Sequence, residues 1–336
     1  GSEANDTAIK IIWYYHNAIG KPQKKKIISR IRGYHGVTVG TASLTGLPAN
    51  HRDFDLPIAN IIHTSCPSHF NFAHPGESEE EFATRCADEL EALIQREGPD
   101  TVAAFFAEPI MGAGGVIVPP RTYFQKIQAV LRRHDVLFVA DEVICGFGRT
   151  GNMWGSQTFD LQPDMLSMAK ALTSGYIPLS ALLVNEKIYR GLVSQSEKIG
   201  VFGHGNTYAA HPVGAAVAVE TLKIYEERNI VEHVRKVGGF MQAELRKLID
   251  HPLVGEVQGA GLIAGLQLVP SKSERGNFDA KEGVAPYFAK RAEAHGLICR
   301  GLFGDRVALC PPLIIDEAQT AEMLRRFKAA LDDTYA

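Results

Sequence analysis

Residues 136–151, VLFVADEVICGFGRTG, contain an apolar run that ends in two acids, Asp141 and Glu142. The run is continuous rather than alternating, which is typical of a strand covered on both faces of a sheet. Similar short runs occupy residues 26–31, 60–64, 101–109, 164–170 and 180–184. They alternate with amphipathic, helix-like stretches, of which 78–98 and 121–134 are the clearest. Strands that alternate with helices predict an α/β fold with a mostly parallel, doubly wound sheet.

The composition changes from about Leu222 onward, where long charged helices and short strands replace the alternating pattern. We predict helices at 230–250 and 281–296, strands at 261–269, 296–300 and 306–311, and a final helix from Asp316. The polar stretch 270–283 is expected to be a surface loop. The sequence therefore predicts a large domain over residues 1–221 and a smaller α+β domain over residues 222–336.

Composition narrows the classes of function. The chain has 336 residues, is 45% hydrophobic and carries a formal net charge of -3, so no field of one sign attracts nucleic acid or a membrane surface. The most apolar stretch, residues 101–120, is interrupted by Glu108, prolines and glycines, and is too short to cross a bilayer. Five scattered cysteines show neither CxxC nor zinc-finger spacing, which favours reduced thiols, a cytoplasmic location and no metal.

Asp141 is the first candidate for chemistry, because ligands of doubly wound sheets bind at the carboxyl ends of the strands. An acid in this place can equally cap the following turn. A nucleotide hydrolase also places an acid there, but the chain has no GxxxxGK[ST] loop to hold phosphates, which excludes that class.

Lys170 ends another apolar run, DMLSMAK, 29 positions after Asp141. An unpaired ammonium inside a protein costs several kcal/mol, so a lysine there must be solvated, paired, or neutral and reactive. A lysine that reaches the surface is the alternative for the run taken alone. Together with Asp141, the lysine favours a reactive site.

Seven segments carry a resemblance that spans essentially the whole chain. They are GSEANDTA (1–8), YHGVTVGTASLTG (34–46), FFAEPIMGAGGVIVPP (105–120), DEVICGFGRTG (141–151), KALTSGYIPLSA (170–181), GHGNTYAAHP (203–212) and ICRGLFGDRVALCPPL (298–313). In this order and spacing the sequence resembles the class III aminotransferases of fold type I, which depend on pyridoxal 5'-phosphate and include omega-amino acid and amine:pyruvate transaminases. Any one segment is a weak signal, whereas seven in order are specific.

The resemblance implies a ping-pong transamination through Lys170 and Asp141. Lys170 would form the Schiff base with pyridoxal 5'-phosphate and move protons, with pyridoxamine 5'-phosphate as the intermediate form of the cofactor. Asp141 would hold the pyridine nitrogen, because a buried carboxylate favours the protonated ring. The donor would be an amine or omega-amino acid, and the acceptor a keto acid such as pyruvate.

Further cofactor residues follow from the same resemblance. Tyr34 would stack on one face of the ring and Val143 would cover the other. The ordinary alternatives are a half-buried tyrosine for Tyr34 and core packing for Val143. Gly1 and Ser2 match the family's phosphate-binding turn at a helix that we expect from Glu3. Glu108 would lie beside the cofactor.

For Thr207 and Arg300 the resemblance implies contacts with groups other than the cofactor of the same chain. Thr207 resembles the threonine that reaches the phosphate of a neighbouring subunit, which implies a homodimer, or a dimer of dimers, with a shared active site. Arg300 resembles the arginine that binds the carboxylate of the amino acceptor. A loop threonine and a surface ion pair are the ordinary alternatives. His35, as a lone histidine, is expected to be structural.

Other activities share these residues. Aminomutases and decarboxylases of the same class need the lysine and the aspartate too, and a noncatalytic protein on the same fold is a further alternative. Relative to the family, the sequence is expected to lack an N-terminal segment that helps to line the substrate pocket, either absent from the protein or part of a longer chain.

Overall fold

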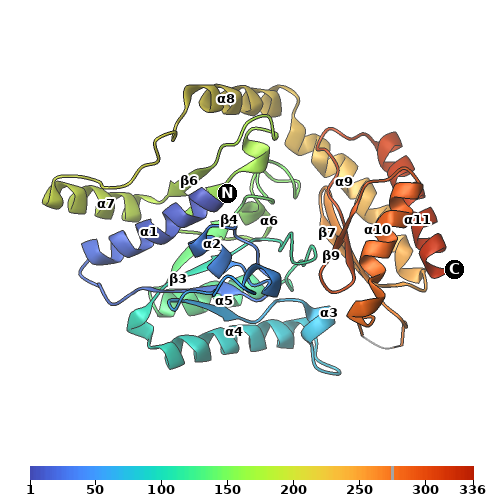
Figure 1. The fold of residues 1–336 in the computed structure, drawn as a ribbon, viewed down its shortest axis with the longest axis horizontal. Coiled ribbons are helices and arrows are strands. Elements are labelled where there is room, and N and C mark those ends of the chain that lie inside the picture. Colours follow the sequence, from blue (N-terminus) through green and yellow to red (C-terminus); the bar gives the residue numbers. More distant parts are fainter. Residues whose placement is uncertain (274–275) are drawn as a thin grey trace.

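The computed structural model describes all residues except 274 and 275, which lie within the loop predicted for 270–283. Figure 1 shows two parts, each with its own sheet, side by side along the longest axis. The part with the larger sheet holds the N-terminus, and the part with the smaller sheet holds the C-terminus. The fold is α/β, as predicted.

The larger sheet has six strands in the order β2-β1-β3-β4-β5-β6. They are β1 (Lys26–Arg30), β2 (Ile61–Thr64), β3 (Val102–Ala107), β4 (Leu137–Asp141), β5 (Met165–Met168) and β6 (Ala181–Val184). Neighbours are parallel except β5 and β6, which are antiparallel. The prediction of a mostly parallel sheet is therefore confirmed.

Helices cover both faces of this sheet. Successive strand residues face opposite sides, and in β3 Phe105 packs in one core cluster while Phe106 packs in the other. The first cluster includes α4 (Glu79–Glu97) and α5 (Tyr123–Arg133), and the second includes α1 (Ser2–Ala18) and α7 (Glu186–Ile199). Burial on both faces explains why these strands are apolar throughout.

The smaller sheet is antiparallel, with the order β7-β8-β10-β9. Its strands are β7 (Val254–Ala260), β8 (Ile263–Leu268), β9 (Arg300–Leu302) and β10 (Arg306–Leu309). It packs with α9 (Ile230–Arg246), α10 (Val284–Ala294) and α11 (Glu317–Tyr335) around one core cluster, in which the Phe288 and Phe327 rings meet at 4.9 Å.

Short elements complete the chain. The remaining α-helices are α2 (Val39–Leu44), α3 (His69–Phe72), α6 (Gly155–Thr158) and α8 (Pro212–Glu227). The 3-10 helices are η1 (Pro48–Asn50), η2 (Pro99–Thr101), η3 (Lys170–Leu172), η4 (Lys247–Asp250) and η5 (Ala280–Glu282). Figure 1 shows α8 standing away from both sheets, with α7 at one end of it and α9 at the other. The predicted domain boundary at 221/222 falls inside α8, and the division itself stays a prediction.

The structure corrects several predicted elements. The strand predicted at 296–300 is wrong for residues 296–299, because Gly296 (φ 75°) follows the end of α10 and β9 starts only where Arg300 pairs with Ala308. The helix predicted at 281–296 begins at Val284, after Gly283 in a left-handed conformation. Strand β7 was not predicted, because its Gly and Gln residues hide the strand pattern. Among the described residues, no helix is long and apolar enough to cross a membrane.

Candidate active site

The carboxyl ends of four neighbouring strands meet at one cavity. Tyr34 follows β1, Glu108 follows β3, Asp141 ends β4 and Lys170 follows β5. The lining is Gly1, Ser2, Tyr34, His35, Gly36, Glu108, Asp141, Val143, Ile144 and Lys170. It contains every predicted cofactor residue except Thr207, although their roles stay predictions.

Asp141 lies at the bottom of this cavity, with its carboxylate almost completely buried. Its Oδ2 accepts a hydrogen bond from Asn5 Nδ2 (2.8 Å) and lies 2.8 Å from His35 Nδ1, and its Oδ1 accepts one from the backbone N–H of Val143 (3.1 Å). Burial alone would raise the pKa of Asp141, but the bonds from His35, Val143 and Asn5 outweigh it and hold the pKa below its usual range. The carboxylate therefore stays ionised and available to a cation in the cavity.

Sequence reasoning assigned no role to Asn5 and treated His35 as a structural residue. Both side chains are buried and contact the Asp141 carboxylate, so they position it. A signal was present: Asn5 lies in SEAND and His35 in YHG, two of the segments that carry the resemblance.

Glu108 supports the neighbouring loops. Its Oε1 accepts a hydrogen bond from the backbone N–H of Tyr34 (3.0 Å), and its Oε2 accepts one from Gly112 N–H (2.9 Å). Burial raises the pKa of this carboxyl group, and the nearby Asp141 adds to the rise. Glu108 thus fixes the backbone that carries the Tyr34 ring.

The N-terminus of α1 enters the cavity through close backbone contacts. A Cβ on Gly1 would lie 2.9 Å from Val143 Cγ2, so only glycine fits without a shift. Ser2 Oγ accepts a hydrogen bond from Val37 N–H (3.1 Å), and a Cβ on Gly36 (φ 138°) would lie 2.5 Å from the same oxygen. A helix N-terminus and a hydroxyl together suit an anionic group such as a phosphate.

Lys170 has an unusual backbone. It is the first residue of η3 and has φ 42°, a left-handed conformation that costs a residue with a Cβ roughly 1–2 kcal/mol. Such strain is found mainly at functional sites. The side chain is exposed to the cavity, and no hydrogen bond or ion pair joins its amine to the described residues.

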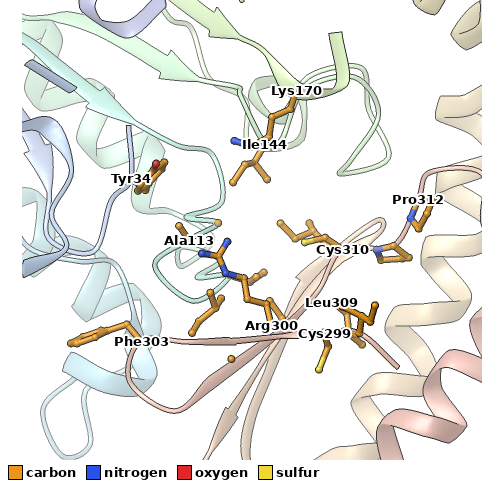
Figure 2. Close-up of a pocket in the computed structure, with 18 of the residues that line it drawn as sticks. Tyr34, Ala113, Ile144, Lys170, Cys299, Arg300, Phe303, Leu309, Cys310 and Pro312 are labelled. Atoms are coloured by element: carbon orange, nitrogen blue, oxygen red, sulfur yellow. The ribbon is translucent and has the colours of Figure 1, made fainter. Parts of the chain in front are cut away.

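A second, larger cavity adjoins the first and shares Tyr34, Ile144 and Lys170 with it. Arg300, at the start of β9, lines this cavity, and Figure 2 shows its guanidinium pointing toward Ala113 with Lys170 on the far side. Arg300 forms no ion pair with any described residue, so the surface ion pair given above as its ordinary alternative is not observed. The guanidinium is free to bind a carboxylate ligand.

Thr207 does not join the cavity of its own chain. It lies in the segment between α7 and α8, where it and its neighbours Asn206 and Tyr208 are exposed. The structure thus separates this residue from the other predicted cofactor residues.

Comparison with known proteins agrees with this geometry. The sequence profile of the family "Aminotransferase class-III" matches residues 1–331. The chain belongs to the class III aminotransferases. Among curated members, "Gamma aminobutyrate transaminase 3, chloroplastic" of Solanum lycopersicum is 51% identical over 99% of this chain, and "Vanillin aminotransferase" of Capsicum frutescens is 51% identical over 99%. The chain spans 64% and 72% of the length of these two class III relatives.

Solved structures of transaminases have the same fold, and the prediction of fold type I is confirmed. An omega transaminase from Pseudomonas jessenii in complex with PMP superposes with a TM-score of 0.97 and 55% identity, over 99% of this chain and 74% of that one. A structure described as "Transaminase with L-ala" gives a TM-score of 0.98 and 56% identity, over 100% of this chain and 79% of that one.

Class III aminotransferases use pyridoxal 5'-phosphate. The cavity fits that cofactor in three respects: an ionised, buried carboxylate at one side, a helix N-terminus with a hydroxyl at another, and a lysine with an unpaired amine at its rim. Tyr34 and Val143 line the same cavity. Among the residues that the structure describes, no cluster of three His, Cys, Asp or Glu side chains could hold a metal ion.

We predict that Glu142→Gln destabilises the loop behind the site. The buried Glu142 carboxylate accepts hydrogen bonds from Gly155 N–H (2.9 Å), Ser156 N–H (2.6 Å) and Ser156 Oγ (2.6 Å). The amide places an N–H₂ group against one of these donors, so the free energy of unfolding should fall by about 1–3 kcal/mol. Urea denaturation followed by tryptophan fluorescence tests this, because Trp154 lies next to Gly155. The exposed Glu293→Gln is the control, and equal stability of both variants would contradict the role.

Proposed function

We propose that the protein is a pyridoxal-phosphate-dependent aminotransferase that moves an amino group from an amine or omega-amino acid to a keto acid. The observation that carries the proposal is the meeting of Lys170 and Asp141 at one cavity, lined also by Tyr34 and Val143. Family membership and relatives named as transaminases support it.

The residues of the cavity divide the work of holding the cofactor. Asp141 would accept the hydrogen bond of the protonated ring nitrogen, with Asn5 and His35 keeping its carboxylate in place. Tyr34 and Val143 would cover the two faces of the ring, and Gly1 and Ser2 at the start of α1 would bind the phosphate. Bound pyridoxal phosphate supplies an electron sink for the charge that develops on the substrate carbon.

Lys170 would act both as the covalent anchor and as the proton carrier. Its free amine would take the proton from the substrate carbon that carries the amino group, hold it as an ammonium, and deliver it to the C4' carbon of the cofactor. The left-handed backbone of Lys170 fixes the direction in which its side chain leaves the backbone, so the amine has fewer orientations to sample before it reacts. The same lysine would run the reverse half-reaction with the keto acid.

Arg300 would bind the carboxylate of the keto acid. The residue lines the cavity that adjoins Lys170 and has no partner among the described residues. A guanidinium fork matches the two oxygens of a carboxylate, which suits pyruvate and similar acceptors. A donor amine without a carboxylate would not need this contact.

Lys170→Ala should abolish both the covalent attachment of the cofactor and transamination. The protein would be incubated with pyridoxal phosphate, reduced with borohydride and mapped by peptide mass spectrometry. We expect the adduct on the peptide that contains Lys170 and none in the variant. Lys290→Ala, an exposed position in α10, is the control and should keep the adduct. Turnover by Lys170→Ala, or an adduct mapped elsewhere, would refute the assignment.

Arg300→Leu should weaken binding of the keto acid and leave binding of an amine donor without a carboxylate unchanged. Loss of a bidentate charged contact should raise KM for the keto acid about 10- to 100-fold, by roughly 1.4–2.8 kcal/mol. KM for an amine donor without a carboxylate should stay within about twofold, since this donor makes no such contact. Steady-state kinetics on both substrates tests the difference, with Arg300→Lys as the charge-conserving control. Equal losses for both substrates would contradict the role of Arg300.

We further propose a homodimer, or a dimer of dimers, in which Thr207 serves the site of the partner copy. Thr207 is exposed and lies outside its own cavity, and apolar side chains around it are exposed as well. Tyr208 is 83% exposed and Val213 and Val219 are each 54% exposed. A second copy of the chain would cover this surface and receive the threonine.

Hybrid dimers distinguish a shared site from a private one. A dimer of one Lys170→Ala chain and one Thr207→Ala chain would have one site with both defects and one intact site. We expect one tightly held cofactor per hybrid dimer in a pyridoxal phosphate titration, whereas Thr207→Ala homodimers hold it weakly. Weak binding by the hybrid would show that Thr207 serves its own chain.

The remaining proposals concern organisation and location. We propose a large domain over 1–221 and a small domain over 222–336, because each range contains one of the two sheets. The boundary between the two ranges falls inside α8. A cytoplasmic location stays a prediction, and relatives named chloroplastic and mitochondrial are known. Cell fractionation with an antibody against the protein would test it.

A further inference from the structure

The hairpin of β9 and β10 determines where Arg300 lies. Strand β9 is the edge of its sheet and pairs only with β10, with Arg300 opposite Ala308 and Leu302 opposite Arg306. The turn between the strands contains Gly304 (φ 73°) and Asp305 (φ 56°), the two positive values of a tight hairpin turn. The position of Arg300 therefore depends on what holds this short, rigid hairpin.

The turn of the hairpin contacts Arg32, which belongs to the other part of the molecule. The Arg32 guanidinium lies 5.3 Å from the centre of the Phe303 ring and 5.1 Å from that of Phe72 in α3. Figure 2 shows Phe303 at the end of the hairpin, away from Arg300. Arg32 thus joins the hairpin to α3 through two cation–π contacts.

A series of hydrogen bonds also connects Arg32 to the turn. Arg32 Nη1 donates to Asn71 Oδ1 (3.2 Å), and Asn71 Nδ2 donates to Gln267 Oε1 (3.5 Å). Gln267 Nε2 in turn donates to the carbonyl of Gly304 (2.7 Å). The turn is held from two sides, and both connections begin at Arg32.

The backbone of Arg32 is built for this position. Its φ is 67°, a left-handed value that is unfavourable for a residue with a Cβ. A Cβ on Gly114 would lie 2.2 Å from the Arg32 carbonyl oxygen, so glycine there permits the close approach of the two backbone segments. Gly114 lies outside the cofactor cavity, so this contact gives a role to a part of the segment FFAEPIMGAGGVIVPP that the cavity leaves unexplained.

Arg32 is also a buried cation, with 7% of its surface exposed, and has no ion pair with a described carboxylate. Burial lowers the pKa of its guanidinium. A buried charge without a carboxylate needs compensation, which aromatic faces supply with roughly 2 kcal/mol when desolvated. The cation–π contacts and the hydrogen bond to Asn71 need the guanidinium, and a methionine at this position would lack both.

We propose that Arg32 is a positioning residue that fixes the distance between Arg300 and the cofactor cavity. Arg32 precedes Tyr34 by two residues, so one loop contacts both the cavity and the Arg300 hairpin. The inference rests on the proposed function, in which Arg300 binds the keto acid. Gly301 packs against Ala285 within the smaller part, but that contact does not reach the cavity.

The test uses Arg32→Met, Phe303→Leu and the double variant in the full, cofactor-loaded protein. We expect amides of residues 300–306 to exchange with deuterium about tenfold faster, because the turn loses its contacts with Arg32, while the Arg306–Gly115 hydrogen bond and the apolar cluster around Val116 still hold the hairpin to the larger part. KM for the keto acid should rise about tenfold in Arg32→Met and less in Phe303→Leu, which keeps the Asn71 and Phe72 contacts of Arg32. The double variant should match Arg32→Met, because that change already removes the Phe303 contact. The half-reaction with an amine donor that lacks a carboxylate should keep its rate within about twofold.

Arg325→Met, on the exposed side of α11, is the control and should match the unmodified protein in both measurements. Unchanged exchange at 300–306 in Arg32→Met would overturn the proposal, and so would additive effects in the double variant. Equal losses in both half-reactions would also overturn it, because they would show general destabilisation. The exchange measurement decides the anchoring of the hairpin even in a protein that transfers no amino group, so failure of the proposed function is recognised separately.

Discussion

A carboxylate inside a protein is stable only where donors replace the water that it has lost. Asp141 meets this condition through Asn5, His35 and the backbone of Val143, which come from three segments far apart in the sequence. The start of α1, the loop after β1 and the end of β4 are thereby brought to one point. Tyr34, Val143 and the N-terminus of α1 take their places around the cavity because these segments converge on that carboxylate.

The second acid of the same pair has the opposite orientation. Glu142 faces away from the cavity and ties the start of α6 to the end of β4. Two adjacent acids thus hold the two sides of one strand end, and burial raises the pKa of Glu142 whereas hydrogen bonds lower that of Asp141. Successive side chains at a strand end point in opposite directions, so these two adjacent carboxylates have different roles.

Sequence patterns were sufficient for the strands with continuous apolar runs and for α4, α5 and α11, which have strong periodicity or caps. They were insufficient for β7, whose two glycines and one glutamine hide the strand pattern, and for β9, whose start depends on pairing with β10. For the site, Lys170 and Asp141 were predicted because a charge at the end of an apolar run is unusual, and the structure places both at one cavity. Asn5 and His35 were missed as partners of Asp141 because their role depends on distances between remote segments.

The boundary between the two parts has a consequence for cooperativity. The core around Phe288 and Phe327 consists of residues between 230 and 331, but a further buried cluster contains side chains of both parts: Ile110, Val116 and Cys145 of the larger part, and Ile263 and Ala308 of the smaller part. Hydrogen bonds such as that from Arg306 Nε to the Gly115 carbonyl cross the same boundary. Because unfolding of either part would expose this shared apolar surface, heat should melt both parts in one transition, with a calorimetric enthalpy close to the van't Hoff value.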